Sequence, residues 1–131
     1  MQVSVKNKQK KCTQEEVLSI LNHINEAVIL HRGYEVFYCN NPLAKMLGFS
    51  DSTELSNDRL FKQDFSKYIH TDDKGIIAYY AENRWKGVPD TPKEYNIRLL
   101  DKSGEIVPVR CKTTIIDWLG EPTILVSMTD Q

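Results

Sequence analysis

Hydrophobic and polar residues alternate along this chain with two different periods. Residues 13–25 carry apolar side chains at helical spacing and predict an amphipathic helix, with Thr13 and Glu16 placed to form a capping box at its start. Its apolar stripe consists of Val17, Leu18, Ile20, Leu21 and Ile24. Residues 28–31 and 35–39 then predict two strands joined by a glycine turn, so a hairpin is expected after the helix.

The middle of the chain predicts short helices and loops. Asn41 is expected to be the N-cap of a short helix with Pro42 in its first position, where no amide donor is needed. The apolar face of this helix and the glycine expected to end it are Leu43, Met46, Leu47 and Gly48. Further short helices and loops are expected over residues 50–71, followed by a longer helix over residues 73–85.

The last third of the chain predicts three strands, over residues 94–100, 105–118 and 123–129. Polar and apolar residues alternate in the first two, so each of these strands has one apolar face. The apolar face comprises Tyr95, Ile97, Leu99, Val107, Val109, Cys111 and Thr113. The elements therefore follow the order helix, two strands, several short helices and three strands without an internal repeat, which predicts an α+β fold.

Composition narrows the class of protein. The chain has 131 residues, of which 40% are hydrophobic and 27% charged, so it predicts one globular domain with a core of its own. No apolar run approaches the length of about 20 residues that a membrane-spanning helix needs. The N-terminus also lacks the apolar segment of a secretion signal. The net charge of −1 gives no general attraction for nucleic acid or anionic lipid.

The ends and the cysteines add two further expectations. Residues 1–12 are interpreted as a flexible basic tail, because their lysines are not interleaved with aromatic residues, and the core domain is expected over residues 26–131. Cys12, Cys39 and Cys111 show no C-x-x-C spacing, so neither a zinc site nor a redox motif is indicated. Three unpaired thiols are typical of a reducing compartment, and we expect a cytoplasmic protein.

Five segments, in their order and spacing, resemble the Per-Arnt-Sim (PAS) family of sensor domains. The resemblance covers about residues 14–131, nearly the whole chain. The segments are ILNHINEAVIL, YCNNPLAKMLGFS, Ile69–Asp73, EYNIRLLDKSGEIVPVRCKTTIID and ILVSMTDQ. The third is similar to the "hPDD" stretch that precedes the family's long helix, and the fourth to its "y-x-x-R-x-x-x-K-D-G" hairpin.

The chain departs from the family pattern at three places. Thr71 stands where the family has proline, and Ser103 is inserted where the family often has an aspartate directly before the glycine. Ser127 and Met128 occupy the first two positions of the closing "D-I-T" motif, so its usual acidic side chain is missing. None of these changes threatens the expected fold.

The resemblance implies a five-stranded antiparallel sheet with short helices packed on one face, in addition to the N-terminal helix. It also implies a sensory or regulatory input domain that signals to an output such as a sensor histidine kinase, a cyclic-dinucleotide enzyme or a transcription regulator. The space between a sheet and short helices is a natural small-molecule pocket. From the alternation we expect its lining to include Leu43, Met46, Ile77, Tyr80, Tyr95, Ile97, Val109, Cys111 and Thr113. Tyr95 and Thr113 are the expected polar contacts.

Two cofactors used by members of the family are disfavoured by the residues of this chain. A haem-binding member carries its axial histidine on the long helix, and residues 73–85 contain no histidine. A light-sensing flavin member uses a reactive cysteine in an N-C-R-F-L-Q segment, whereas Asn57–Lys62 has Asp58 at that position. A carboxylate cannot form the thiol adduct, so no covalent flavin adduct is expected. The identity of any cofactor is left open, including non-covalent flavin.

The sequence carries no catalytic or metal-binding signature. His70, Asp72 and Asp73 are interpreted as a helix cap rather than a metal site, because carboxylates favour helix N-termini and no second ligand pair lies at a useful spacing. The G-x-S-x-G, H-E-x-x-H and P-loop motifs are absent, as are kinase and cyclase signatures. We therefore expect no enzymatic activity in this chain, and a small enzyme is the least favoured interpretation.

Two functions of different classes stay open. In the first, a small ligand or a partner binds between sheet and helices and the change passes to an output domain, in the same chain or in a partner signalling protein. In the second, the interior is filled and the domain is a ligand-free interaction and dimerisation module. The N-terminal helix is expected to be a link to the output domain and a dimer contact, so a homodimer is predicted. The contact residues are Val17, Leu18, Leu21 and Ile24.

Overall fold

The computed structural model describes residue 13 and residues 24–32, 35–58 and 64–131. The elements in chain order are β2 Ala27–Arg32, β3 Glu35–Cys39, α2 Asn41–Met46, α3 Ser52–Asn57, the 3-10 helix η1 Phe65–Tyr68, α5 Thr71–Trp85, β4 Glu94–Leu100, β5 Ile106–Trp118 and β6 Glu121–Asp130. None of the helices in these ranges is long and apolar enough to cross a membrane.

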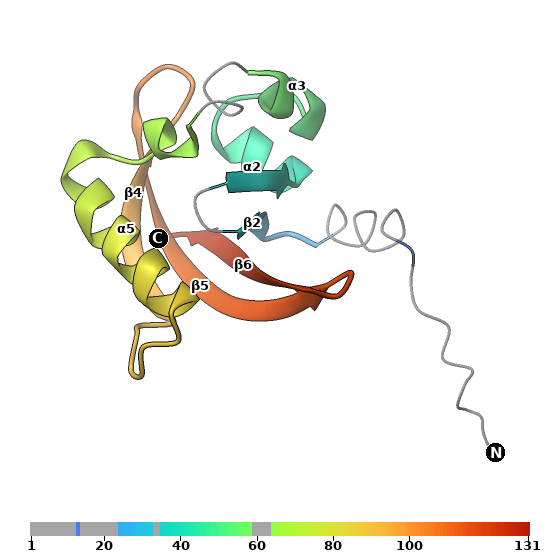
Figure 1. Ribbon diagram of the computed structural model, residues 1–131. Helices are drawn as coiled ribbons and strands as arrows, with labels where there is room; N and C mark the ends of the chain where they lie inside the picture. Colours follow the sequence, from blue (N-terminus) through green and yellow to red (C-terminus); the bar gives the residue numbers. More distant parts are fainter. Residues whose placement is uncertain (1–12, 14–23, 33–34, 59–63) are drawn as a thin grey trace.

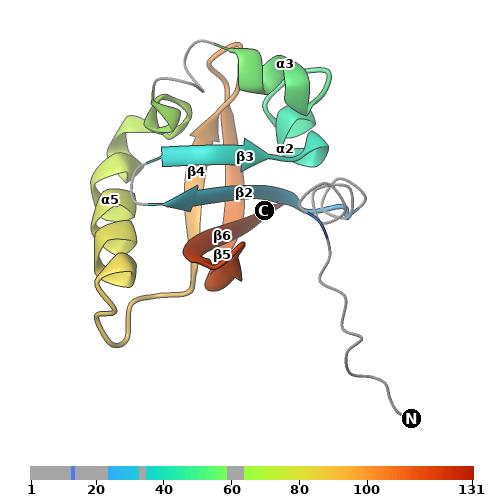
Figure 2. The same cartoon turned by 45° about the vertical axis from the view of Figure 1, so that its right-hand side comes forward.

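The five strands form one antiparallel sheet in the order β3-β2-β6-β5-β4 (Figures 1 and 2). The last strand of the chain, β6, lies in the centre, between β2 and β5. Ala27 pairs with Met128 across β2 and β6, and Cys111 pairs with the same Met128 across β5 and β6. The predicted five-stranded antiparallel sheet is confirmed, and β3 and β4 have the predicted bounds.

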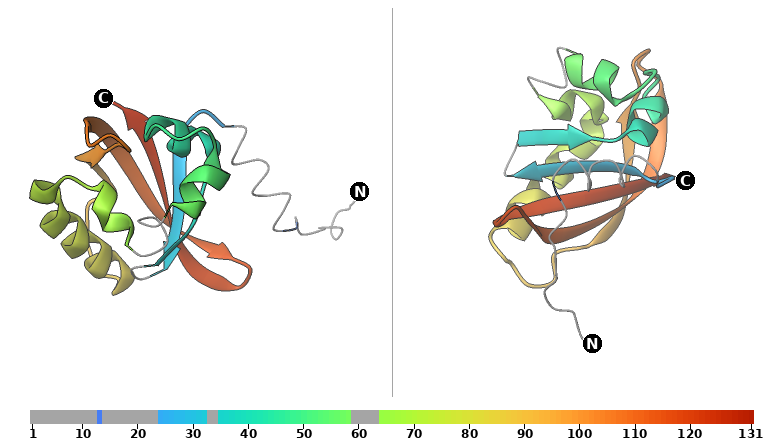
Figure 3. Two further views of the ribbon diagram at one scale, coloured as in Figure 1. Left: turned by 90° about the horizontal axis from the view of Figure 1, so that it is seen from above. Right: turned by 90° about the vertical axis from the view of Figure 1, so that its right-hand side faces the viewer.

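The helices pack against one face of this sheet, and the core lies between the two layers. Side chains at alternate positions of the strands point toward the helices, as the period of two requires. Leu43, Leu47 and Leu55 from the α2–α3 region are fully buried in the same cluster as Ile29, Val109 and Met128 from the strands. In the left-hand view of Figure 3, as in Figure 1, α5 lies apart from α2 and α3. The helical layer therefore has two separate parts.

Asn40, and not Asn41, is the N-cap of α2, so the predicted cap residue is wrong. The Asn40 side-chain oxygen accepts hydrogen bonds from the backbone N–H of Leu43, at 3.2 Å, and of Val28, at 2.9 Å. Its amide nitrogen donates to the Glu26 carbonyl at 2.9 Å. Asn41 is the first helical residue, which moves Pro42 to the second position, and its side-chain oxygen accepts from Ser52 N–H at 2.8 Å.

The remaining boundaries differ from expectation at a few positions. Gly48, with φ of +91°, follows the end of α2 as predicted. The long helix begins at Thr71, two residues earlier than expected, because His70 is its N-cap. Residues 24–26 form a bend, so the expected N-terminal helix does not extend to residue 25. The rest of that helix and the basic tail lie outside the described residues, apart from Thr13.

Replacing Asn40 by alanine is expected to destabilise the domain by about 2–4 kcal/mol. The variant loses a helix cap and also leaves the buried N–H of Val28 without an acceptor. Asn41→Ala is the matched control and is expected to cost less than about 1 kcal/mol, because it removes one hydrogen bond to Ser52. Urea unfolding of both variants measures the difference. Equal losses for the two variants would contradict the role assigned to Asn40.

Candidate ligand-binding cavity

A cavity of about 440 Å³ lies between the inner face of the sheet and the segment that contains η1 and α5. This volume falls in the range of about 300–1,000 Å³ that is typical of small-molecule sites. The lining residues are Ile29, His31, Val36, Asp64, Phe65, Ser66, Ile69, Lys74, Ile77, Ala78, Ala81, Arg84, Tyr95, Ile97, Leu99, Cys111, Val126 and Met128. The lining is mainly aliphatic, with a small number of polar side chains.

The cavity exists because α5 carries small side chains in the middle of the face that it turns toward the sheet. Lys74, Ile77, Ala78, Ala81 and Arg84 all line it, at the helical spacing i, i+3, i+4, i+7 and i+10, so they form one stripe along the helix. Two of the five are alanines, whose side chains are single methyl groups and occupy little of the space. Of the 15 residues of α5, only Arg84 is buried. The helix thus covers the sheet without filling the space beneath it.

Four of the nine residues expected in the pocket line this cavity: Ile77, Tyr95, Ile97 and Cys111. Three of these four come from the inward faces of β4 and β5, where Tyr95 pairs with Cys111 and Ile97 with Val109. Alternation along the two strands was sufficient to find these positions.

The other five expected residues lie elsewhere. Leu43 and Val109 are fully buried in the core, and Met46 packs against that core, because α2 lies directly on β2 and leaves no open space. The Tyr80 ring packs on the Tyr95 ring at 5.2 Å between centroids, outside the lining. Thr113 borders a neighbouring hollow of about 350 Å³, and its backbone N–H donates to the Lys93 carbonyl at 2.8 Å.

Sequence reasoning missed the charged members of the lining. Lys74 and Arg84 lie on the same helical stripe as Ile77, three residues before it and seven residues after it. This spacing could have identified both residues, but the expected lining of α5 was chosen from its apolar and aromatic residues. His31 is far from α5 in the sequence, but β2 brings it to the cavity. Asp64, the N-cap of η1, accepts hydrogen bonds from Ser66 N–H at 3.0 Å and from its hydroxyl at 2.6 Å.

Arg84 and Tyr95 form the polar end of the cavity. The Arg84 guanidinium donates a hydrogen bond from Nη2 to the Pro92 carbonyl and is also hydrogen-bonded to Tyr95. Burial, aided by Cys111, raises the pKa of Tyr95 to about 12, although Arg84 acts in the opposite direction. At neutral pH the Tyr95 hydroxyl is therefore protonated and has a hydrogen to donate while its oxygen accepts from Arg84.

Asp73 and Arg98 hold the start of α5 against β4. The Asp73 carboxylate accepts three hydrogen bonds from Arg98, from the backbone N–H at 2.8 Å, from Nε at 3.1 Å and from Nη2 at 2.8 Å. The Arg98 side chain lowers the pKa of Asp73 because its hydrogen bonds favour the charged carboxylate, while partial burial opposes this shift. The backbone of His70 adds a hydrogen bond to the Arg98 carbonyl at 2.9 Å.

Other histidine, cysteine and aspartate side chains make contacts that stabilise the fold. His70 accepts a hydrogen bond at Nδ1 from Asp72 N–H at 3.1 Å, which is a helix-capping contact. Burial raises the pKa of Cys39 to about 11 and that of Cys111 to about 12, so both thiols are protonated at neutral pH. The prediction that these two cysteines are buried is confirmed. Asp58 accepts a hydrogen bond from the Tyr68 hydroxyl at 2.6 Å.

Comparison with known proteins identifies the family. A family model described as the PAS fold matches residues 36–129. The chain is similar to the PAS domain of a protein from Desulfitobacterium hafniense, with 15% identity and a TM-score of 0.68, covering 86% of this chain and 99% of that one. The search of curated proteins finds no match.

Two further solved structures have the same fold. One is a PAS domain from a two-component sensor histidine kinase, with 17% identity and a TM-score of 0.62, covering 89% of this chain and 95% of that one. The other is the PAS domain of an HTR-like protein from Haloarcula marismortui, with 12% identity and a TM-score of 0.66, covering 89% and 90%. At these identities the similarity shows the fold and not the ligand.

The ion pair between Asp73 and Arg98 is expected to make stability depend on pH. Because the folded-state pKa of Asp73 lies below its ordinary value of 3.8, its stabilisation is complete above that value and is lost as the pH falls through the folded-state pKa. Asp73→Asn should therefore lower the urea midpoint at pH 7, and the gap from the unsubstituted protein should narrow below about pH 4. Asp72→Asn, an exposed neighbour on the same helical turn, is the control. A gap that stays constant down to pH 2 would contradict this assignment.

Proposed function

The chain belongs to the PAS family, as the match over residues 36–129 shows, and on this premise we propose that it is the sensory input domain of a signalling protein. A small ligand occupies the cavity beneath α5, and its binding changes the output of a catalytic or regulatory domain. The observation that carries this proposal is the cavity itself, which a purely structural domain of this size would gain stability by filling.

The walls of the cavity give the signal a route out. Val126 and Met128 line it from β6, the central strand, so a ligand in contact with them also acts on both neighbouring strands. Met128 pairs with Ala27, which begins β2 directly after the bend at residues 24–26. We therefore place the relay at this pair, where the N-terminal segment joins the sheet.

The output domain is proposed to be a sensor histidine kinase or a cyclic-dinucleotide signalling enzyme, in the same chain or in a partner protein. The similarity to a PAS domain of a two-component sensor histidine kinase supports the first. In such an assembly the protein works as a homodimer, and the helix that carries the apolar stripe of residues 17–24 forms the contact between the subunits and the link to the output domain. This domain itself then has a regulatory and not a catalytic task.

The cavity is expected to hold a ligand in the purified protein. Native mass spectrometry should show a mass above that of the bare chain, and denaturation should remove the excess. Ala81→Phe places a ring in the cavity at little cost in strain and is expected to lower the loaded fraction at least about tenfold. Glu82→Phe, which puts the same ring on the exposed side of α5, should leave it unchanged. A bare mass in all three proteins would favour a ligand-free interaction module.

Dimerisation is expected to depend on the N-terminal stripe. Light scattering should give the mass of a dimer for the unsubstituted protein and the mass of a monomer for the double variant Leu18→Glu/Leu21→Glu, because buried charges disrupt an apolar contact. Ser19→Glu adds a charge to the same segment away from the stripe and should leave the dimer intact. A monomer at high concentration of the unsubstituted protein would rule out this contact.

A further inference from the structure

Arg84 is a buried cation, and no carboxylate among the described residues is buried with it. Its residue exposure is 7%, and none of the ion pairs among the described residues involves it. Its hydrogen-bond partners, the Pro92 carbonyl and the Tyr95 hydroxyl, are neutral. They satisfy donors of the guanidinium but do not balance its charge, and an uncompensated charge in an apolar site is costly.

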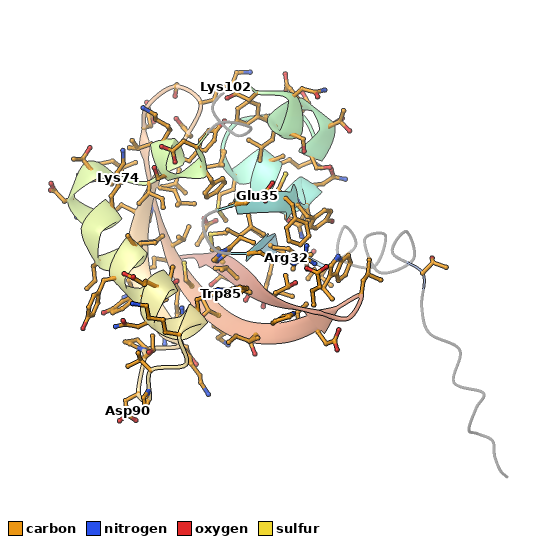
Figure 4. All side chains as sticks on the ribbon, in the orientation of Figure 1. Arg32, Glu35, Lys74, Trp85, Asp90 and Lys102 are labelled. Carbon is orange, nitrogen blue, oxygen red and sulfur yellow. The ribbon has the colours of Figure 1, made fainter. Side chains whose placement is uncertain are left out.

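The positive charge at the Arg84 end of the cavity is not balanced by a negative charge of the described lining. Lys74 lies on the first turns of α5, at the opposite end of the helix from the loop that contains Asp90 (Figure 4). The helical rise puts Lys74 about 15 Å from Arg84 along the axis. Asp64, the one carboxylate that the described part of the chain contributes to the lining, interacts electrostatically with Lys74. The charge of Lys74 is thus balanced within the lining, and that of Arg84 is not.

The rest of the lining is suited to the apolar part of a ligand. Between the two charged ends the cavity is bordered by aliphatic side chains from both layers, including Ile29, Ile77, Ala81, Ile97 and Val126. Burial of apolar surface against these residues supplies most of the free energy of binding. A ligand that matches this lining has one anionic group and an extended apolar body.

We propose that the cavity binds an apolar organic carboxylate, with its carboxylate group on Arg84 and Tyr95 and its apolar body directed along α5. The proposal rests on the proposed sensory function and names the class of ligand. The planar fork of a guanidinium matches the two oxygens of a carboxylate, and the Tyr95 hydroxyl offers one further donor. A single unbalanced positive charge matches a monoanion, and the dianionic phosphate group would leave one negative charge uncompensated.

The carboxylate 4-phenylbutyrate and its neutral amide, 4-phenylbutanamide, are probes of nearly equal shape that differ in charge. Isothermal titration calorimetry on the full chain is expected to show that the carboxylate binds about 10- to 100-fold more tightly than the amide, as a charge-assisted hydrogen bond predicts. The ratio of the two dissociation constants is the quantity that reports on the anion site, because the apolar contacts of the two probes are the same.

Two substitutions assign this ratio to the proposed residues. Arg84→Gln keeps a donor for the Pro92 carbonyl but removes the charge, so the ratio is expected to fall to about 1. Tyr95→Phe keeps the ring and the guanidinium, and is expected to lower the ratio several-fold. Arg110→Gln is the control, because Arg110 is half-exposed and pairs with Glu94 at 2.6 Å outside the cavity, and its ratio should equal that of the unsubstituted protein.

The outcomes separate this proposal from the sensory function. Equal affinities of the two probes for the unsubstituted protein would overturn the anion site, although the cavity would still be shown to bind a ligand. A ratio that survives both Arg84→Gln and Tyr95→Phe would also overturn it. Binding of neither probe would overturn it as well, while the mass measurement on Ala81→Phe judges the sensory function independently. If Arg84→Gln loosens the loop at Pro92 and fails to fold, Tyr95→Phe decides the question.

Discussion

The side chain of Asn40 joins the parts of the fold on which the cavity depends. It is fully buried and bonds to three backbone groups of two segments, Val28 N–H and the Glu26 carbonyl at the start of β2 and Leu43 N–H in α2, while its own backbone N–H donates to the Val28 carbonyl at 3.1 Å. Hydrogen bonds in such a dry environment are strong, and an unmet partner is correspondingly costly. The amide therefore fixes α2 to the start of β2. The next residue of that strand, Ile29, is already part of the cavity wall.

The two parts of the helical layer are held by different forces. Large aliphatic side chains such as Leu43 and Leu55 fix α2 and α3 to the sheet through packing. Helix α5 has alanines on its inward stripe, so its start is held by the Asp73–Arg98 pair and by the bridge between Ile69 and Leu99 next to it. At its end, Arg84 holds the loop through Pro92. Polar contacts at both ends thus keep the helix over a space that its own side chains do not fill.

Most of the fold could be predicted from the sequence, because strands leave a clear local signal. The alternation over residues 94–100 gave the bounds of β4 and its inward face without any knowledge of its neighbours. The predicted N-cap of α2 was one residue too late, because Asn40 and Asn41 both have suitable side chains. Only the position of Val28 N–H, 12 residues before Asn40, distinguishes them. Local sequence contains no information on that contact.

The chemistry of the cavity was harder to predict, because it depends on distances between layers. Leu43 and Ile77 have the same character in a helix, yet one fills the core and the other borders open space. The difference arises from what each helix lies against: α2 packs directly on β2, whereas α5 borders the cavity. A cation on a helix is expected to face solvent, and Arg84 departs from this rule because β4 brings Tyr95 and the Pro92 loop to meet it. A polar residue that continues an inward helix stripe containing alanines is therefore the feature to search for in sequences of this fold, since small side chains leave the space in which a buried charge meets a ligand.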